Sequence, residues 1–189
     1  MSAIYLDYNA TTPIDPEVSA AMRPFLASGL AGIFGNPSSG HEYGRIAHEA
    51  VEEARELVAS LLGCAPDEVV FTGCGSEADN LAIKGVAESR GNRGDHIITS
   101  QIEHPAVLNA CRYLERRGCR VIYLPVDGRG RVSPADVERA LTPDTILVSI
   151  MHANNETGTI QPIPEIAAVA RGRGVLVHSD AAQSVGKIP

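Results

Sequence analysis

The chain has 189 residues, of which 44% are hydrophobic, and its 16 Lys and Arg against 23 Asp and Glu give a formal charge of −7. At roughly 150 residues per domain, this length predicts about one domain with a large shared core, and the even spread of apolar residues argues against disorder. The acidic balance argues against direct nucleic-acid binding, and no stretch reaches the roughly 20 apolar residues that a membrane span needs.

The N-terminus and the cysteines predict a cytoplasmic protein. Residues 1–7 contain no basic segment followed by an apolar one, so we expect no signal peptide. Cys64, Cys74, Cys111 and Cys119 form no C-x-x-C pair, and no His stands at zinc-finger spacing from them. We therefore expect a reducing compartment, no disulfide framework and no metal site.

The first 40 residues are rich in Gly and Pro, so we expect residues 1–40 to form an arm and loops ahead of a domain over residues 41–189. Residues 44–63 repeat apolar side chains at helical spacing, with glutamates on the other side, which predicts an amphipathic helix that Gly63 ends. The apolar run 69–72 predicts a buried strand, and a Gly-containing turn then leads into a helix over 76–90.

The same alternation continues to the end of the chain. We expect strands at 97–99, 121–124, 145–150 and 175–178, separated by helices at 105–117, from 133 onward, and at 163–173. Strands that are apolar on both faces, with amphipathic helices between them, are typical of a mainly parallel sheet covered on both sides. The sequence therefore predicts a three-layer α/β/α fold.

In such a sheet, ligands bind beyond the carboxyl ends of the strands. Polar residues gather there after four of the expected strands, in the segments 73–78, 100–105, 152–158 and 178–183. Gly75 and Ser76 place flexible backbone and a hydroxyl at a helix N-terminus, which suits a phosphate and equally suits an ordinary helix cap.

A dinucleotide site is an alternative for the same segment. Gly73, Gly75 and Ala78 fit the pattern G-x-G-x-x-A, and Glu103 is a candidate ribose-binding acid about 28 residues beyond Gly75. That spacing exceeds the usual ~20 residues, and this interpretation gives no role to the polar groups after the later strands.

Four further residues have the chemistry of a cofactor site. Asp180 ends an apolar strand, where its carboxylate suits a cationic ring nitrogen, a helix cap or an ion pair. His104 is a candidate stacking ring or proton carrier, with a simple capping role as the alternative. Asn155 and Gln183 are neutral donors that suit a phenolate oxygen or a substrate carboxylate, with turn formation as the alternative.

Six segments stand in the order of a known family: YLDYNATTP at 5–13, GNPSSGH at 35–41, FTGCGSEADN at 71–80, SQIEH at 100–104, NNETG at 154–158 and HSDAAQ at 178–183. They span residues 5–183, and the sequence resembles the cysteine desulfurases of the NifS/IscS type over nearly its whole length. These belong to class V of the fold-type I pyridoxal-phosphate (PLP) enzymes.

The resemblance implies roles for the candidate residues. Gly75 and Ser76 would contact the cofactor phosphate, His104 would stack on its ring, and Asp180 would pair with the ring nitrogen. Asn155 and Gln183 would contact the ring oxygen or the substrate carboxylate. Cys74-Gly75-Ser76 departs from the Gly-Ala-Thr of many relatives, but Ser keeps the hydroxyl.

The resemblance also implies a reaction and its partners. L-Cysteine would yield alanine and an enzyme persulfide, whose sulfur would pass to an iron–sulfur scaffold or another acceptor protein. The protein would be a homodimer, and residues 1–40 would join a small domain of the complete enzyme.

The covalent chemistry of the family lies outside these 189 residues. Its Schiff-base lysine follows a Ser-x-His motif that is not present here, and the only lysines are Lys84 and Lys187. None of the four cysteines matches the family's nucleophile. Three hypotheses follow: a desulfurase of which this is roughly the N-terminal half, another class V enzyme such as an aminotransferase, and a non-catalytic assembly module.

Overall fold

The computed structural model describes residues 3–27, 29, 32–90 and 92–188, and its backbone separates into two compact units, Met1–Phe71 and Thr72–Pro189. The expected division into 1–40 and 41–189 stays a prediction for the complete protein. Within this chain the long helix α2 groups with the N-terminal residues.

The first unit consists of α1 (Pro16–Leu26), α2 (Glu42–Leu62) and the short 3₁₀ helix η2 (Pro66–Glu68). Helix α1 lies in the segment expected to be an arm with loops. The Asp15 carboxylate accepts the N–H of Glu17 at 2.8 Å, and Pro16 occupies the first helical turn, so local capping starts this helix despite the Gly and Pro nearby.

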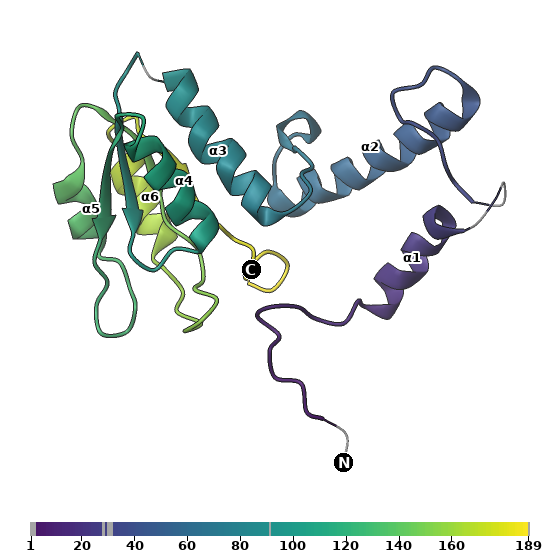
Figure 1. The fold of residues 1–189 in the computed structure, drawn as a ribbon, viewed down its shortest axis with the longest axis horizontal. Helices are drawn as coiled ribbons and strands as arrows, with labels where there is room; N and C mark the ends of the chain where they lie inside the picture. Colours follow the sequence, from purple (N-terminus) through teal and green to yellow (C-terminus); the bar gives the residue numbers. More distant parts are fainter. Residues whose placement is uncertain (1–2, 28, 30–31, 91, 189) are drawn as a thin grey trace. The chain divides into compact units, whose positions relative to one another are not determined.

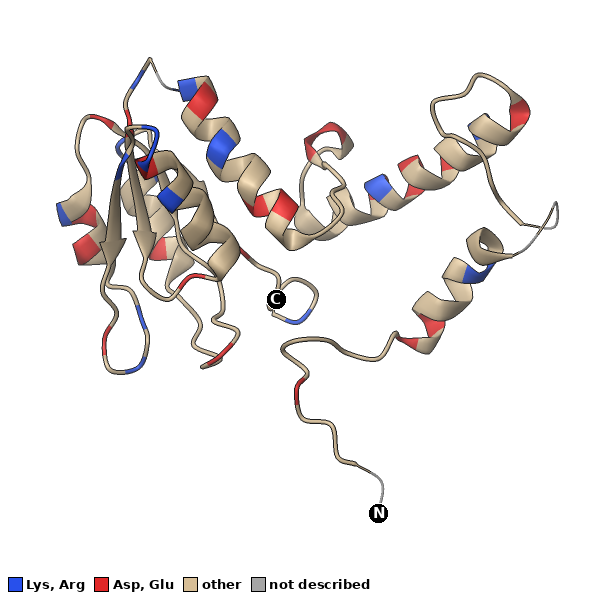
Figure 2. Ribbon diagram, in the orientation of Figure 1, with Lys and Arg blue, Asp and Glu red and all other residues tan. Residues whose placement is uncertain are grey.

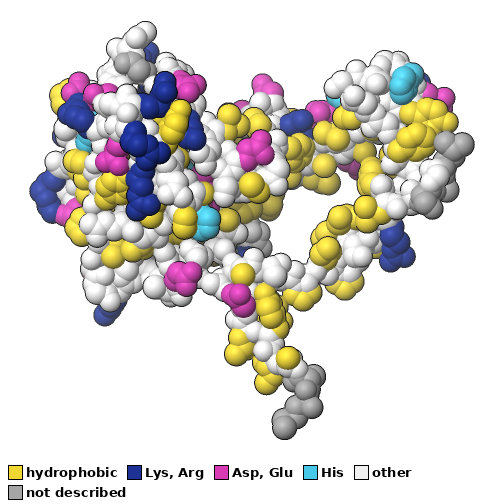
Figure 3. Space-filling view, in the orientation of Figure 1, with side chains coloured by type: hydrophobic (Ala, Val, Ile, Leu, Met, Phe, Trp, Pro, Cys, Tyr) yellow, Lys and Arg dark blue, Asp and Glu magenta, His cyan; other side chains and the backbone are white. Residues whose placement is uncertain are grey.

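Helix α2 confirms the prediction for 44–63, and Gly63 ends it in the left-handed conformation at φ 68°. Acidic residues predominate among its charged side chains (Figure 2). Hydrophobic side chains lie exposed along α1 and α2 (Figure 3), and an apolar groove of about 580 Å³ runs between these helices and the segment joining them.

The prediction of a strand at 69–72 is wrong. The backbone is extended there but pairs with no strand: the Val69 N–H donates to Pro66, and the Val69 carbonyl accepts from the Arg55 guanidinium at 2.6 Å. Val70 and Phe71 are exposed. A short apolar run predicts a strand only where a neighbouring edge takes its hydrogen bonds, and here a side chain and a turn take them.

The second unit alternates helices and strands, as the sequence predicts (Figure 1). In chain order it contains α3 (Gly75–Arg90), β1 (His96–Ser100), α4 (Pro105–Glu115), β2 (Arg120–Leu124), α5 (Pro134–Ala140), β3 (Thr145–Ser149), α6 (Ile163–Arg171) and β4 (Leu176–His178). The four strands form one parallel sheet in the order β2-β1-β3-β4.

Two buried clusters cover opposite faces of this sheet. On one face, Ile97 and Leu147 pack with residues of α3 and α4; on the other, Ile98 and Val148 pack with residues of α5 and α6. Successive residues of a strand point to opposite faces, so the neighbours Ile97 and Ile98 join different clusters. The three-layer α/β/α arrangement is therefore confirmed.

Candidate active site

The carboxyl ends of β1, β3 and β4 meet at one edge of the sheet, where parallel strands place their following loops. Main-chain bonds hold the last two loops together: the Ile150 N–H donates to the His178 carbonyl at 3.1 Å, and the His152 N–H to the Asp180 carbonyl at 2.8 Å. Residues 150–152 and 178–180 therefore run side by side.

Glu103 ties the loop after β1 to this pair. Its carboxylate is buried, and it accepts the Ser100 hydroxyl at 2.5 Å and the Met151 N–H at 3.0 and 3.1 Å. The pKa of Glu103 is raised to about 7, mainly by burial and in smaller part by the nearby Asp180, against the lowering effect of these hydrogen bonds and of His178.

Asn154 makes a second tie between the same loops. Its amide Nδ2 donates to the Ile102 carbonyl at 2.9 Å, and its Oδ1 accepts the N–H groups of Glu156 and Thr157, both at 2.9 Å. A single buried side chain therefore shapes the turn that contains Asn155 and anchors it to the loop before His104.

Asp79 and His178 tie the start of α3 to β4. The His178 ring lies between Asp79, whose Oδ1 is 3.5 Å from Nε2, and Ser149, whose hydroxyl is 2.9 Å from Nδ1. Asp79 is buried on the first turns of α3. The contact links the helix that begins at Gly75 to the strand that leads to Asp180.

We expect Asp79→Ala to lower the free energy of unfolding by about 1–2 kcal/mol, because it removes a buried carboxylate and its 3.5 Å contact with the half-buried His178 ring. Urea denaturation followed by circular dichroism measures this change. Asp136→Ala is the matched control: Asp136 pairs with Arg139 on the surface of α5, so we expect a loss below about 0.5 kcal/mol. Equal losses in the two variants would contradict the role of Asp79.

The phosphate candidates lie at the first residues of α3. Gly75 and Ser76 are exposed, and a Cβ placed on Gly75 would meet no atom within 4 Å. The Cys74 carbonyl accepts the N–H groups of Glu77 and Ala78, which leaves the N–H groups of Gly75 and Ser76 outside the helical ladder. Open space, N–H donors and a hydroxyl at the start of a 16-residue helix fit a phosphate.

The other candidates lie on the neighbouring loops. His104 caps α4, where its Nδ1 accepts the Ala106 N–H at 3.2 Å, and its side chain is otherwise exposed. Asp180 is half-buried, and its Oδ1 accepts the Ala182 N–H at 3.0 Å. Asn155 donates to the Glu156 carboxylate at 3.0 Å, and Gln183 is half-buried in the turn after β4.

The set as a whole has the chemistry that PLP needs: phosphate donors, a carboxylate for a pyridinium nitrogen and a ring for stacking. All six candidates lie in the second unit, at helix starts or in loops after strands. Their contacts with a cofactor stay predictions. Among the described residues, no group of three or more His, Cys, Asp or Glu is arranged to hold a metal ion.

The burial of Glu103 argues against the dinucleotide alternative. A ribose-binding acid must present its oxygens to the ligand, whereas Glu103 is 4% exposed and both oxygens bond within the protein. The G-x-G-x-x-A pattern therefore has no ribose-binding acid at Glu103.

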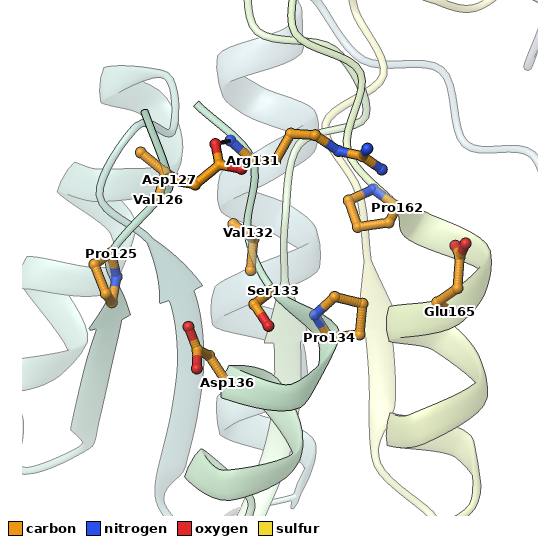
Figure 4. A pocket seen from close by; sticks show the side chains of 10 residues that line it. All are labelled: Pro125, Val126, Asp127, Arg131, Val132, Ser133, Pro134, Asp136, Pro162 and Glu165. Carbon is orange, nitrogen blue, oxygen red and sulfur yellow. Dashed lines mark hydrogen bonds between the residues drawn. The ribbon is translucent and has the colours of Figure 1, made fainter. Parts of the chain in front are cut away.

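A cavity of about 470 Å³ lies elsewhere on the second unit, where the loop after β2 meets the starts of α5 and α6 (Figure 4). It is lined by one arginine, Arg131, and by three carboxylates, Asp127, Asp136 and Glu165. The Asp127 carboxylate accepts the N–H groups of Arg129 and Arg131, which lowers its pKa and uses it to hold a turn. None of the six candidate residues lines this cavity.

Comparison with known families decides the relationship. The family described as aminotransferase class-V matches residues 4–189. The chain belongs to this family. Among the most similar members are proteins named cysteine desulfurase IscS, from Dictyoglomus turgidum at 53% identity and from Pseudomonas aeruginosa at 55%, each over 98% of this chain and 46% of the relative.

Solved structures also superpose well on this chain. A NifS-like protein superposes with a TM-score of 0.92 at 45% identity, over 98% of this chain and 50% of the other. A structure described as SspA in complex with cysteine superposes with a TM-score of 0.89 at 45% identity, over 95% of this chain and 51% of the other. The chain thus spans about half the length of these class V relatives, and the resemblance to fold-type I PLP enzymes is confirmed.

Lys84 is half-buried on α3, and Lys187 is exposed in the turn after β4. The Lys84 ammonium lies 4.4 Å from the ring centroid of Tyr113 on α4. Among the described residues no helix is both long and apolar enough to cross a membrane.

The sequence predicts no supporting role for Asp79, Asn154 or Glu103. One signal was available: Asp79 stands four residues before Ile83, so the carboxylate shares the buried face of α3. For Asn154 and Glu103 no spacing rule applies, because their partners are 52 and 48 residues away.

Proposed function

We propose that this protein is a PLP-dependent cysteine desulfurase, which takes the sulfur of L-cysteine, leaves L-alanine and passes the sulfur on as a cysteine persulfide. The observation that carries the proposal is the edge of the sheet where Asp79 and His178 join the start of α3 to the strand before Asp180. The names of the relatives at 53–55% identity support the same activity.

Asp180 would hold the cofactor at its ring nitrogen. The carboxylate is half-buried and already accepts one N–H, so its second oxygen is suited to a pyridinium N–H. Keeping that nitrogen protonated lets the bound ring draw electrons from the substrate's α-carbon, which is the chemistry that PLP supplies.

The remaining candidates would orient the two ends of the ligand. The N–H groups of Gly75 and Ser76 and the Ser76 hydroxyl would hold the phosphate, at the positive end of the α3 dipole. The His104 ring would stack on the pyridine and carry a proton beside it. Asn155 and Gln183 would donate to the ring oxygen or to the substrate carboxylate.

The sulfur-transfer step needs two groups that these 189 residues do not supply in family positions. A lysine would move the α-proton of cysteine, and a cysteine thiolate would attack the substrate sulfur. The new S–S bond would form as the Cβ–S bond breaks, and the electron pair of that bond, with a proton, would end on the carbon that becomes the methyl group of alanine. Lys84 and Lys187 do not match the family's lysine, and no cysteine here matches its nucleophile.

We propose further that the protein is a cytoplasmic homodimer that delivers sulfur to an iron–sulfur scaffold or another acceptor protein. The IscS name of the relatives supports a sulfur-transfer role, and the free cysteines are consistent with a reducing compartment. The exposed apolar side chains of α1 and α2 are consistent with further packing partners.

The test is to incubate the full-length protein with PLP, L-cysteine and a thiol reductant, and to measure alanine and sulfide. We expect the two products in equal amounts. Transfer of the amino group to a keto acid would indicate an aminotransferase, and the absence of any turnover would indicate an assembly module; either result would overturn the proposal.

A second experiment tests the lysine assignment. We expect the 189-residue chain by itself to release no sulfide from cysteine and to form no borohydride-reducible adduct with PLP. Intact-mass measurement after reduction detects such an adduct. A stoichiometric adduct mapped to Lys187 would show that the assignment is wrong.

A further inference from the structure

Glu103 is buried although the next residue in the chain, His104, is exposed. A buried carboxylate is costly unless hydrogen bonds replace the water that it loses. An apolar side chain would fill the same space at a lower cost. The position therefore calls for a role beyond packing.

The contacts of Glu103 join two loops of the site. The Ser100 hydroxyl, at the end of β1, donates to Oε1 at 2.5 Å, and the Met151 N–H, two residues after β3, donates to both oxygens. The carboxylate thus accepts hydrogen bonds from Ser100 at the end of β1 and from Met151 in the loop after β3, the strand that pairs with β1.

The same loop is held from its other side. The Asn154 amide donates to the Ile102 carbonyl at 2.9 Å, so the residue before Glu103 is tied to a residue three positions after Met151. His104 follows immediately and starts α4 as its cap. The placement of the His104 ring therefore depends on how the preceding loop is anchored to the residues after β3.

We propose that Glu103 is a positioning residue of this site, which fixes the His104 ring relative to the loops after β3 and β4 by tying residues 100–104 to the Met151 backbone. The proposal rests on the proposed function, which gives His104 its contact with the cofactor ring. Glu103 itself touches neither cofactor nor substrate.

The first part of the test needs no cofactor. In the full-length protein, we expect Glu103→Ala to raise the hydrogen-exchange rate of the Met151 amide by about ten-fold, because that buried N–H loses its acceptor. Glu103→Gln keeps an oxygen acceptor and should stay within about two-fold of the wild type. Thr145→Val is the matched control: it removes a buried hydrogen bond to His96 at the opposite end of the same strands.

The second part measures the cofactor. We expect Glu103→Ala to weaken PLP binding by about ten-fold and to change the visible circular dichroism of bound PLP. The reason is that a displaced His104 ring would no longer stack on the cofactor in one orientation. Glu103→Gln should restore both signals, and Thr145→Val should leave both unchanged. A purely structural role for Glu103 would lower stability without altering the dichroism.

Wild-type affinity and dichroism in Glu103→Ala would overturn the proposal, as would an unchanged Met151 amide. If Glu103→Ala does not fold, Ser100→Ala takes its place: it removes only the hydroxyl donor, and we expect the same dichroic change at a smaller size. If the wild-type protein takes up no PLP, the proposed function fails, and the exchange rate of Met151 then decides whether Glu103 holds the loop.

Discussion

Asp180→Ala is expected to lower the rate of alanine formation by the full-length protein by about a hundred- to a thousand-fold. The reason is electrostatic: Asp180 would be the counter-charge of a protonated ring nitrogen, and without this carboxylate the bound cofactor would stabilise negative charge at the substrate carbon poorly. The measurement is kcat/KM for L-cysteine, with PLP at saturating concentration.

Asp127→Ala is the matched control for this prediction. Both carboxylates lie in a loop after a strand and accept backbone N–H groups, Asp127 from Arg129 and Arg131 and Asp180 from Ala182. If loss of the turn alone lowered the activity, both variants should lose activity to the same extent. A control that lost as much activity as Asp180→Ala would contradict the charge-pairing role.

Glu103→Gln is expected to change how stability depends on pH. Burial raises the pKa of Glu103 from its ordinary 4.5 to about 7, so the folded protein keeps a proton that the unfolded chain releases. Below about pH 4.5 the group is protonated in both states; between about 4.5 and 7 the free energy of unfolding falls; above about 7 the loss is complete. The full loss is about 3 kcal/mol, at roughly 1.4 kcal/mol per pKa unit.

Glutamine does not titrate, so the variant should lack this loss. Urea denaturation at about pH 4.5, 6 and 8 should show the variant gaining about 3 kcal/mol relative to the wild type across the series. Thr99→Val, which removes a buried hydroxyl of β1 that has no hydrogen-bond partner among the described residues, should run parallel to the wild type. If Glu103→Gln also ran parallel, the carboxylate would not be the titrating group.

Together these results would separate the effect of Glu103 on stability from its effect on the position of the loop before His104. The carboxylate costs stability at neutral pH, yet it accepts three hydrogen bonds that hold the loop before His104. The two expectations are compatible because Glu103→Gln keeps one oxygen acceptor for the loop and removes only the buried charge.

Most of the fold follows from local patterns in the sequence. Continuous apolar runs predict β1 and β3, both fully buried, and amphipathic spacing predicts α2 and α4. The strand at 69–72 fails because a strand requires a partner edge, and the sequence does not say that Arg55 takes the Val69 carbonyl. Helix α1 is missed because its cap, Asp15-Pro16, stands among Gly and Pro residues that favour turns.

The candidate site divides in the same way. By itself, the sequence determines the six residues predicted to contact the cofactor and the chemistry of each one. Local patterns show where strands end and helices start, and the order of the motifs is specific to one family. The tertiary structure alone decides which buried groups hold those residues in place. Asp79 with His178, Glu103 with Met151 and Asn154 with Ile102 are pairs separated by 48 to 99 residues, and only the parallel packing of β1, β3 and β4 brings them together.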